Sequence, residues 1–85
     1  MKYLNNVYFG DILRKYRKAK DLTQIEVAAQ VQSLGSTLTS DTYAKIEKGQ
    51  RNIFFEDFVL LKMVLEFEYA DFYRPYEDEV RKRNT

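Results

Sequence analysis

The chain has 85 residues, which is room for one domain with a single small core. It is 45% hydrophobic and 32% charged, a balance typical of globular proteins that excludes a disordered chain, and no apolar run is long enough to cross a membrane. Because it contains no cysteine and no histidine, disulfides, thiol catalysis, the usual zinc sites and a general base that titrates near neutral pH are excluded as well.

The charges are unevenly distributed along the chain, although the net charge is only +1. Residues 1–53 hold nine Lys and Arg against five Asp and Glu, a net +4, whereas residues 54–79 hold two against eight, a net −6. The residues from Val80 onward add +3. A basic half beside an acidic segment favours one face that meets an anion, and an uneven but merely solvated surface is the alternative.

A first helix is predicted by apolar residues at i, i+3, i+4 and i+7, which share one helical face. Asn5 or Asn6 can cap its start. Its opposite face is basic near the C-terminal end, where cations suit the helix dipole. The apolar residues are Phe9, Ile12, Leu13 and Tyr16, and the basic ones are Arg14, Lys15, Arg17 and Lys18.

A second helix is predicted to begin at a capping box, with Thr23 as the N-cap and Glu26 at the third helical position. Ile25 lies beside the apolar stripe of this helix and is expected to be partly exposed. Gly35 and Ser36 mark the break after the helix. The stripe itself consists of Val27, Ala28 and Val31.

A third, short helix is predicted after the N-cap Thr39, because Leu38 before it and Tyr43 within it match a hydrophobic staple. Gly49 fits the left-handed position that follows a last helical turn. The helix has two unlike sides. Tyr43, Ile46 and Glu47 lie on one side, and Ser40, Asp41, Thr42, Lys45 and Lys48 lie on the other.

Two more helices are predicted in the C-terminal third. A strongly apolar one covers about residues 55–65, and a short one covers residues 69–73 and ends by Arg74, because the residue before Pro75 disfavours helix. The charged tail, residues 75–85, is expected to fray or to extend a helix into solvent, which leaves a core of about residues 6–74. The apolar helix carries Phe55, Phe58, Val59, Lys62 and Met63 in one row, with Leu61 and Leu65 nearby.

The polar side of the third helix is placed where it can meet a DNA duplex. A helix N-terminus offers free N–H groups and a partial positive charge, which suit phosphate. A short helix held by its apolar side can lie in a major groove while the N-terminus of a partner helix contacts the backbone. Ser40, Asp41 and Lys45 supply the small and long polar side chains that such a helix needs.

The sequence LTQIEVA, beginning at Leu22, and the sequence YAKIEKGQR, beginning at Tyr43, together resemble the phage Cro/repressor-like (XRE-like) family of helix-turn-helix domains. The resemblance spans roughly residues 9–73. It implies an all-α fold, a compact bundle of four to five helices of the lambda repressor-like DNA-binding type, with residues 1–85 as a single domain. The matching positions are Arg17, Leu22, Thr23, Gln24, Glu26, Val27 and Ala28, followed by Tyr43, Ile46, Glu47, Gly49 and Arg51.

The resemblance also implies roles for individual residues. Arg17 pairs with Glu47 and braces the first helix against the third. Ser40, Asp41 and Lys45 fall where the family reads bases. The DNA backbone is met by Thr23, Gln24, Thr39, Thr42, Gln50, Arg51 and Asn52.

The sequence departs from the family pattern in three places. The segment between Ala28 and Glu47 is longer than in the shortest members, which leaves the register of Ser40 and Asp41 open. The proline that often follows the Gly-x-Arg sequence is absent. Asp41 is an unusual residue to place near phosphates: it can accept a hydrogen bond from cytosine N4, or it is simply a first-turn acid favoured by the helix dipole.

The aromatic residues near the C-terminus offer a seam for a homodimer, because large exposed aromatic patches usually mark interfaces. A two-fold dimer would place two recognition helices about one DNA turn apart on a palindromic site. The alternative is that Phe67 and Phe72 close the core and leave tyrosine hydroxyls in water. The candidates for the seam are Tyr69, Phe72, Tyr73 and Tyr76.

These observations predict a small cytoplasmic transcription regulator that binds an operator in double-stranded DNA through the third helix and dimerises at least on DNA. Repression by occupying the operator is the favoured role, and activation is the alternative. No catalytic residues, cofactor, metal or membrane contact is expected, and the start of the chain lacks the apolar segment of a secretory signal. One alternative is an antitoxin of the same fold that binds its operator and also a toxin through the C-terminal aromatic surface. Another is a protein-interaction module that has lost DNA binding, which the near-neutral charge and Asp41 favour.

Overall fold

The computed structural model describes residues 6–84, with side chains from Tyr8 onward. Within that range the chain forms five α-helices and no strand, which confirms the predicted all-α class. Asn6 is the first residue of the first helix, and Asn5, the other residue expected to cap it, lies outside the described residues. The helices are α1 (Asn6–Ala19), α2 (Gln24–Ser33), α3 (Ser40–Glu47), α4 (Phe55–Leu65) and α5 (Ala70–Arg83).

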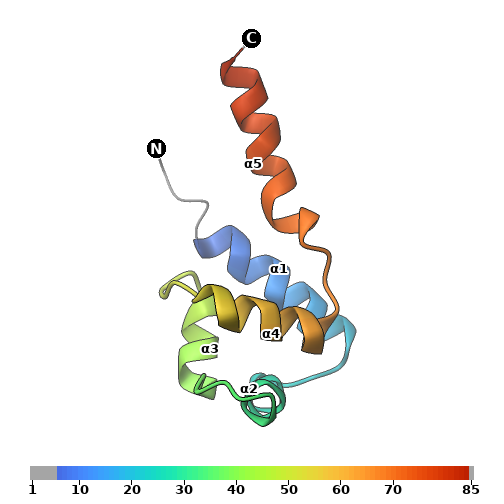
Figure 1. The fold of residues 1–85 in the computed structure, drawn as a ribbon, viewed down its shortest axis with the longest axis vertical. Coiled ribbons are helices and arrows are strands. Elements are labelled where there is room, and N and C mark those ends of the chain that lie inside the picture. The colour runs from blue at the N-terminus through green and yellow to red at the C-terminus, as the bar shows by residue number, and fades with distance from the viewer. Residues whose placement is uncertain (1–5, 85) are drawn as a thin grey trace.

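The first four helices form the body of the molecule, and α5 extends away from it (Figure 1). α1 packs against α3, α4 and α5, while α2 packs against α3 and α4. The C-terminal end of α5 and the α2–α3 pair therefore lie at opposite ends of a molecule whose extents are 45 × 21 × 19 Å (Figure 1). None of these helices is both long and apolar enough to cross a membrane.

The core lies where the apolar stripes predicted for the first three helices meet α4 and the start of α5. Leu13 of α1, Val27 of α2 and Tyr43 of α3 are fully buried, whereas Ile25, expected to be partly exposed, is 71% exposed. The staple residue Leu38 is buried in the same cluster as Tyr43. The other buried members of the cluster are Ile12, Val31, Ile46, Leu61, Leu65, Phe67 and Phe72.

The backbones of α1 and α3 approach each other most closely at Gly10. A Cβ atom at this position would lie 2.0 Å from the carbonyl oxygen of Glu47 and 2.7 Å from that of Ile46, far inside van der Waals contact. Glycine is therefore required here by the close crossing of two helices rather than by its backbone angles. The crossing fixes the end of α3 against α1.

The predicted helix boundaries are confirmed where they rest on capping residues. The Thr23 hydroxyl accepts from the N–H of Glu26 at 3.1 Å, and the Glu26 carboxylate accepts from the N–H of Thr23 at 2.9 Å, which completes the capping box. The Thr39 hydroxyl accepts from the N–H of Thr42 at 3.2 Å, so Thr39 is the N-cap of α3. Gly49 follows α3 with a φ of 75°, in the left-handed region.

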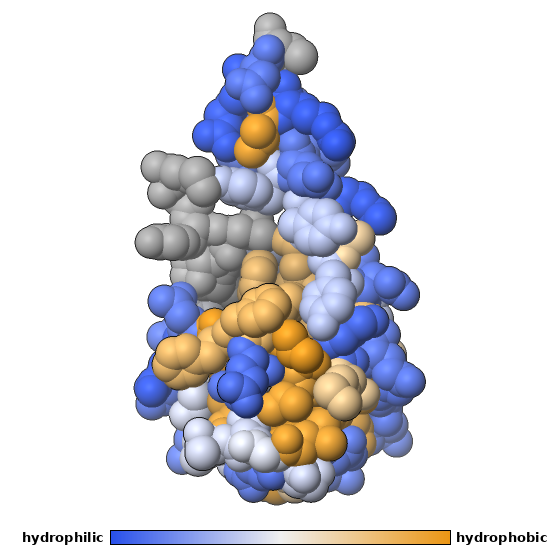
Figure 2. Space-filling view, in the orientation of Figure 1, coloured by the Kyte–Doolittle hydropathy of each residue, from blue (hydrophilic) through white to orange (hydrophobic). Residues whose placement is uncertain are grey.

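The buried face of α4 differs from the predicted row. Phe55 and Met63 are 79% and 60% exposed, whereas Leu61 and Leu65 are buried and Phe58 is half-buried. Because α4 is apolar on nearly every side, periodicity alone does not select the face that packs inward. The consequence is an exposed apolar surface over α4, which Figure 2 shows on the side facing the viewer.

The fifth helix does not end at Arg74 as predicted, but continues through Pro75 to Arg83. A proline inside a helix has no N–H to donate to the carbonyl four residues earlier, which here belongs to Asp71. The Tyr8 hydroxyl donates to that carbonyl at 2.8 Å instead. The helix can therefore pass through the proline without leaving this carbonyl unpaired.

The charged tail forms the distal part of α5, so of the two predicted outcomes the helical one is observed. Acidic residues precede basic ones by four positions along this part of the helix, the arrangement that stabilises an exposed helix. The basic residues also fall in the last turn, where they suit the helix dipole. The acidic residues are Glu77, Asp78 and Glu79, and the basic ones are Arg81, Lys82 and Arg83.

Phe72 was a candidate for the dimer seam, and this prediction is wrong because Phe72 is only 2% exposed. Its ring centroid lies 4.6 Å from that of Phe67 and 4.8 Å from that of Phe9, so it closes the core. Tyr69 and Tyr73 are 38% and 51% exposed and remain on the surface.

Candidate nucleic-acid interface

The exposed side of α3 carries the residues that were predicted to read bases. Asp41 and Lys45 are exposed one turn apart, and Ser40 is half-buried at the N-terminal end of the helix. Neither Asp41 nor Lys45 forms an ion pair with any residue in the described part of the chain, although they stand at i and i+4. Both side chains are therefore available to a ligand.

Thr39 and Thr42, both predicted to meet the DNA backbone, are held by the cap of α3. Their hydroxyl oxygens lie 3.1 Å apart, in hydrogen-bond contact, and the Thr39 hydroxyl also accepts from the backbone N–H of Thr42. The cap fixes the direction in which α3 leaves the turn. It thereby orients the polar side of the helix relative to the rest of the molecule.

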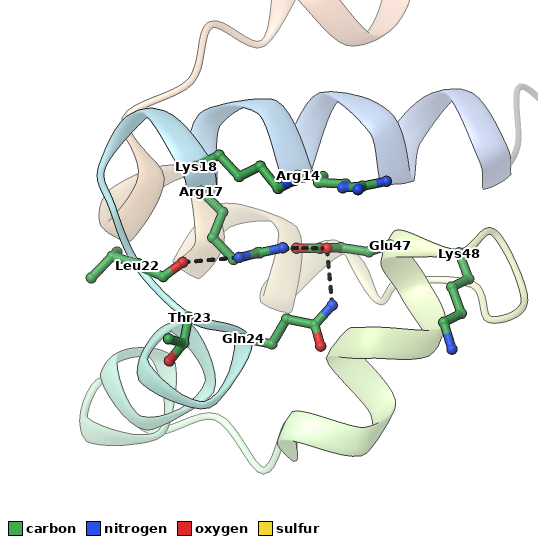
Figure 3. A pocket seen from close by; sticks show the side chains of 8 residues that line it. All are labelled: Arg14, Arg17, Lys18, Leu22, Thr23, Gln24, Glu47 and Lys48. Carbon is green, nitrogen blue, oxygen red and sulfur yellow. Dashed lines mark hydrogen bonds and ion pairs between the residues drawn. The ribbon is translucent and has the colours of Figure 1, made fainter.

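The other end of α3 is held by a buried ion pair between Arg17 and Glu47, the two residues that the resemblance pairs. Arg17 Nε lies 2.6 Å from Glu47 Oε2 and Arg17 Nη2 lies 3.0 Å from Oε1, so the contact is bidentate. The Glu47 side chain is 3% exposed and that of Arg17 is 12% exposed. Arg17 Nη1 also donates to the carbonyl of Leu22 at 2.9 Å (Figure 3).

Burial acts to raise the pKa of Glu47, but opposing interactions, the hydrogen bonds from Arg17 first among them, hold that pKa below its usual value. Gln24 Nε2 is 3.0 Å from Glu47 Oε1. Gln24 was predicted to contact a phosphate, and its amide nitrogen joins the first turn of α2 to the end of α3. The network therefore fixes three helices around one carboxylate.

Tyr43 is fully buried beside this network. Burial raises its pKa well above the usual value of a phenol. Its hydroxyl is buried without a hydrogen-bond partner among the described residues. A buried hydroxyl without a hydrogen-bond partner lowers the stability of the fold, because the hydrogen bonds that it makes to water in the unfolded chain are not replaced.

A hollow of about 520 Å³ opens above the ion pair, between α1, the start of α2 and the end of α3 (Figure 3). Its outer lining includes three exposed cations, Arg14 and Lys18 from α1 and Lys48 from the end of α3. The family resemblance assigns no DNA contact to these three residues. The i, i+4 spacing of Arg14 and Lys18 was visible in the sequence, but only the packing of α1 on α3 shows which way they face.

A second hollow, of about 170 Å³, lies on the other flank of α3. Thr42 and Ile46 of α3 line it, whereas Glu47 and Lys48 line the first hollow. The one cation that lines the second hollow is Arg51, from the loop after Gly49, and the one carboxylate is Asp57 of α4. Arg51 and Asn52 both line this second hollow, and with Gln50 they are exposed, so the three loop residues predicted to meet the backbone lie together beside α3.

The comparisons with known proteins agree with this arrangement. A family profile described as "Helix-turn-helix" (HTH_3) matches residues 13–61. The crystal structure of the restriction-modification controller protein C.AhdI from Aeromonas hydrophila is similar, with 30% sequence identity and a TM-score of 0.66 over 78% of this chain and 92% of that one. No curated protein sequence matches the chain. The chain belongs to the helix-turn-helix family HTH_3, the Cro/C1-type DNA-binding transcription regulators, which are not enzymes.

Proposed function

We propose that the chain is a sequence-specific regulator of transcription that occupies an operator in double-stranded DNA through α3 and acts as a repressor in the cytoplasm. One observation carries the proposal: the polar side of α3 lies between two hollows, of which one is lined by the exposed cations Arg14, Lys18 and Lys48 and the other by Arg51 and Asp57. The similarity to a controller protein favours a regulatory role.

The arrangement suits a major groove for a geometric reason. The groove is about 12 Å wide and admits one α-helix, and a phosphate backbone runs along each of its edges. A helix that enters the groove needs polar side chains toward the bases and cations on both flanks. Lys45 is exposed on the polar side of α3, where it would face the bases. Arg51 lies on one flank of the helix, and Arg14 lies on the other.

Within this proposal, Ser40, Asp41 and Lys45 contact base edges. Asp41 has no cationic partner among the described residues, so its carboxylate can accept from cytosine N4. The remaining contacts position the protein on the backbone and carry no sequence information themselves. They come from Thr23, Gln24, Thr39, Thr42, Gln50, Arg51 and Asn52.

We also propose that the protein binds as a homodimer on a palindromic operator, with one α3 in each half-site. Tyr69, Tyr73 and Tyr76 remain candidates for the seam. Phe55 and Met63 on α4 are 79% and 60% exposed and belong to a second exposed apolar surface, and large apolar patches mark interfaces. Sedimentation of Tyr73→Lys and Phe55→Lys variants on the operator distinguishes the two surfaces, because only the variant at the true seam binds as a monomer.

The test of the proposed function is selection from a library of random DNA duplexes with the purified protein, followed by affinity measurements at several salt concentrations. An enriched palindromic motif, with an affinity that falls steeply as salt rises, is the expected result because phosphate contacts release counterions. No enrichment, or an affinity that hardly changes with salt, would contradict the proposal. A protein-interaction module that had lost DNA binding would give either of these contradicting results.

A further inference from the structure

We propose that the distal segment of α5, residues 77–83, pairs antiparallel with the same segment of a second copy of the chain, and that this contact joins molecules bound to two separate DNA duplexes. The inference rests on the proposed function, because the joined molecules hold DNA. The contact is a self-association surface distinct from the seam of the operator dimer. It lies outside residues 13–61, the part of the chain that the helix-turn-helix profile matches.

The distal segment of α5 projects beyond the body of the molecule (Figure 1). The first half of α5 is held against α1, where Tyr8 donates to the carbonyl of Asp71. The charged residues beyond Pro75 are all exposed, and Val80 is the one aliphatic residue among them. Figure 2 shows an isolated apolar spot within a hydrophilic surface on this projection. A short helix gains most of its stability by packing an apolar side against a partner, so this segment is suited to pairing.

The order of charges around Val80 identifies the partner as a second copy. Acidic residues occupy the three positions before Val80 and basic residues the three positions after it. In an antiparallel pair with Val80 at the two-fold axis, the acidic half of each helix lies beside the basic half of the other. Parallel pairing would place like charges beside each other, which is unfavourable. The segment is therefore complementary to itself in one orientation.

Helical spacing selects the ion pairs that this contact forms. Glu77 and Arg81 share one flank of the apolar side. Glu79 and Arg83 share the other flank. Across the two-fold axis, each carboxylate meets the guanidinium that follows it by four positions, but in the second copy. Glu77, Glu79 and Arg83 form no ion pair among residues 8–84. Arg81 lies 3.3 Å from Asp78, and an exposed pair of this kind is exchanged at little cost.

The small size of the contact sets the condition under which it forms. The segment is about 10 Å long at the helical rise per residue. Interfaces that bury less than about 1,200 Å² are weak between molecules free in solution. DNA that holds several molecules side by side makes the contact multivalent and raises the local concentration of the segments. The pairing therefore takes effect between occupied duplexes.

The shape of the molecule excludes this contact as the seam of an operator dimer. α5 runs along the longest axis, which is 45 Å, and the α2–α3 pair lies at the opposite end (Figure 1). An antiparallel pair of distal segments places the two α3 helices at opposite ends of an assembly nearly twice as long as one molecule. The half-sites of one operator require them about 34 Å apart on one duplex. Two duplexes, one at each end, fit the assembly instead.

The experiment measures the capture of a second duplex. One duplex with several copies of the selected operator is fixed to beads, and a fluorescent duplex of the same sequence is added with bound protein. The wild type should capture the fluorescent duplex. A variant with Glu77→Arg and Glu79→Arg should bind the bead duplex and capture none, because its distal segments are basic throughout. A variant with Arg81→Glu and Arg83→Glu should also capture none, because its segments are acidic throughout.

The two variants together supply the rescue. When each is loaded on its own duplex and the two are mixed, capture should return, because a basic segment then meets an acidic one. The matched control for the first variant is Asp11→Arg with Glu68→Arg, which changes the net charge by the same amount at exposed positions outside α5. This control should capture the second duplex as the wild type does.

Binding to a single duplex is measured in the same series and separates the two proposals. If the wild type binds one duplex but captures no second one, the inference fails and the proposed function stands. Capture that persists in either variant alone, or that the mixture does not restore, would also overturn the inference. If the wild type binds no duplex at all, the inference and the proposed function fall together.

Discussion

At the scale of single residues, Glu47 is the buried charge on which the arrangement of α1, α2 and α3 depends. Arg17 and Gln24 satisfy its two oxygens, and the backbone of Leu22 occupies a further donor of Arg17. A buried pair of this kind contributes little relative to apolar residues, but breaking it leaves one charge without compensation. The pairing itself could be predicted only through the family resemblance, because no local pattern joins residues so far apart in the sequence.

Arg17→Met should therefore lower the free energy of unfolding by roughly 3 kcal/mol, because it leaves the Glu47 carboxylate buried beside an apolar side chain. Urea denaturation measures the loss. Arg14→Met is the matched control, since Arg14 is exposed on the same helix and has no ion-pair partner among the described residues. A loss as small as that of the control would show that the pair does not brace the fold.

The lowered pKa of Glu47 makes stability depend on pH in acid. Because the pKa is lower in the folded than in the unfolded protein, this group stabilises the fold above its unfolded value of about 4.3, and the contribution is lost as pH falls through the folded pKa. Unfolding free energies measured between neutral pH and strong acid should fall less steeply below pH of about 4 in Glu47→Gln than in the wild type. Parallel curves would contradict this assignment.

Tyr43→Phe should leave the free energy of unfolding within about 1 kcal/mol of the wild type or raise it, because it removes a buried hydroxyl that has no partner. Denaturant unfolding of the two proteins side by side checks this. A loss of more than that amount would show that the hydroxyl pairs with the neighbouring Glu47 carboxylate. Tyr43→Ala, which empties a fully buried site, should cost several-fold more and serves as the reference.

At the scale of helices, local chemistry predicts where an element begins and long-range contacts decide where it continues. The caps at Thr23 and Thr39 and the left-handed Gly49 are local signals, and all were predictable. The passage of α5 through Pro75 was not, because the donor that satisfies the freed carbonyl is Tyr8, 63 residues before Asp71. Sequence periodicity also failed to select the buried face of α4, which is apolar on most sides.

The crossing of α1 and α3 gives a prediction at this scale. Gly10→Ala should lower the free energy of unfolding by about 1–3 kcal/mol, although alanine favours helices, because its Cβ would lie 2.0 Å from the Glu47 carbonyl oxygen. Chemical denaturation measures the change. Ala19→Gly, in the exposed last turn of α1, is the control that measures the effect of helix propensity on the free energy of unfolding without a steric clash. A stabilised Gly10→Ala protein would show that the two helices do not pack this closely.

At the scale of the whole molecule, the structure separates two regions. The α2–α3 pair, with its two flanking hollows, forms one end, and the projecting α5 forms the other (Figure 1). The predicted base-reading residues could be placed from the sequence, because they share one side of a short capped helix. The contribution of Arg14, Lys18 and Lys48 could not, because it depends on how α1 lies across the end of α3.

The central claim is that α3 reads bases while the surrounding cations hold the backbone. The most direct measurement compares the wild type, Lys45→Ala and Arg51→Ala on the selected duplex and on every single base-pair substitution of it. Lys45→Ala should relax the preference at one or two base pairs by roughly 1–3 kcal/mol each, whereas Arg51→Ala should weaken binding to all duplexes about equally. If both variants bind every duplex as the wild type does, α3 and its loop do not form the DNA interface.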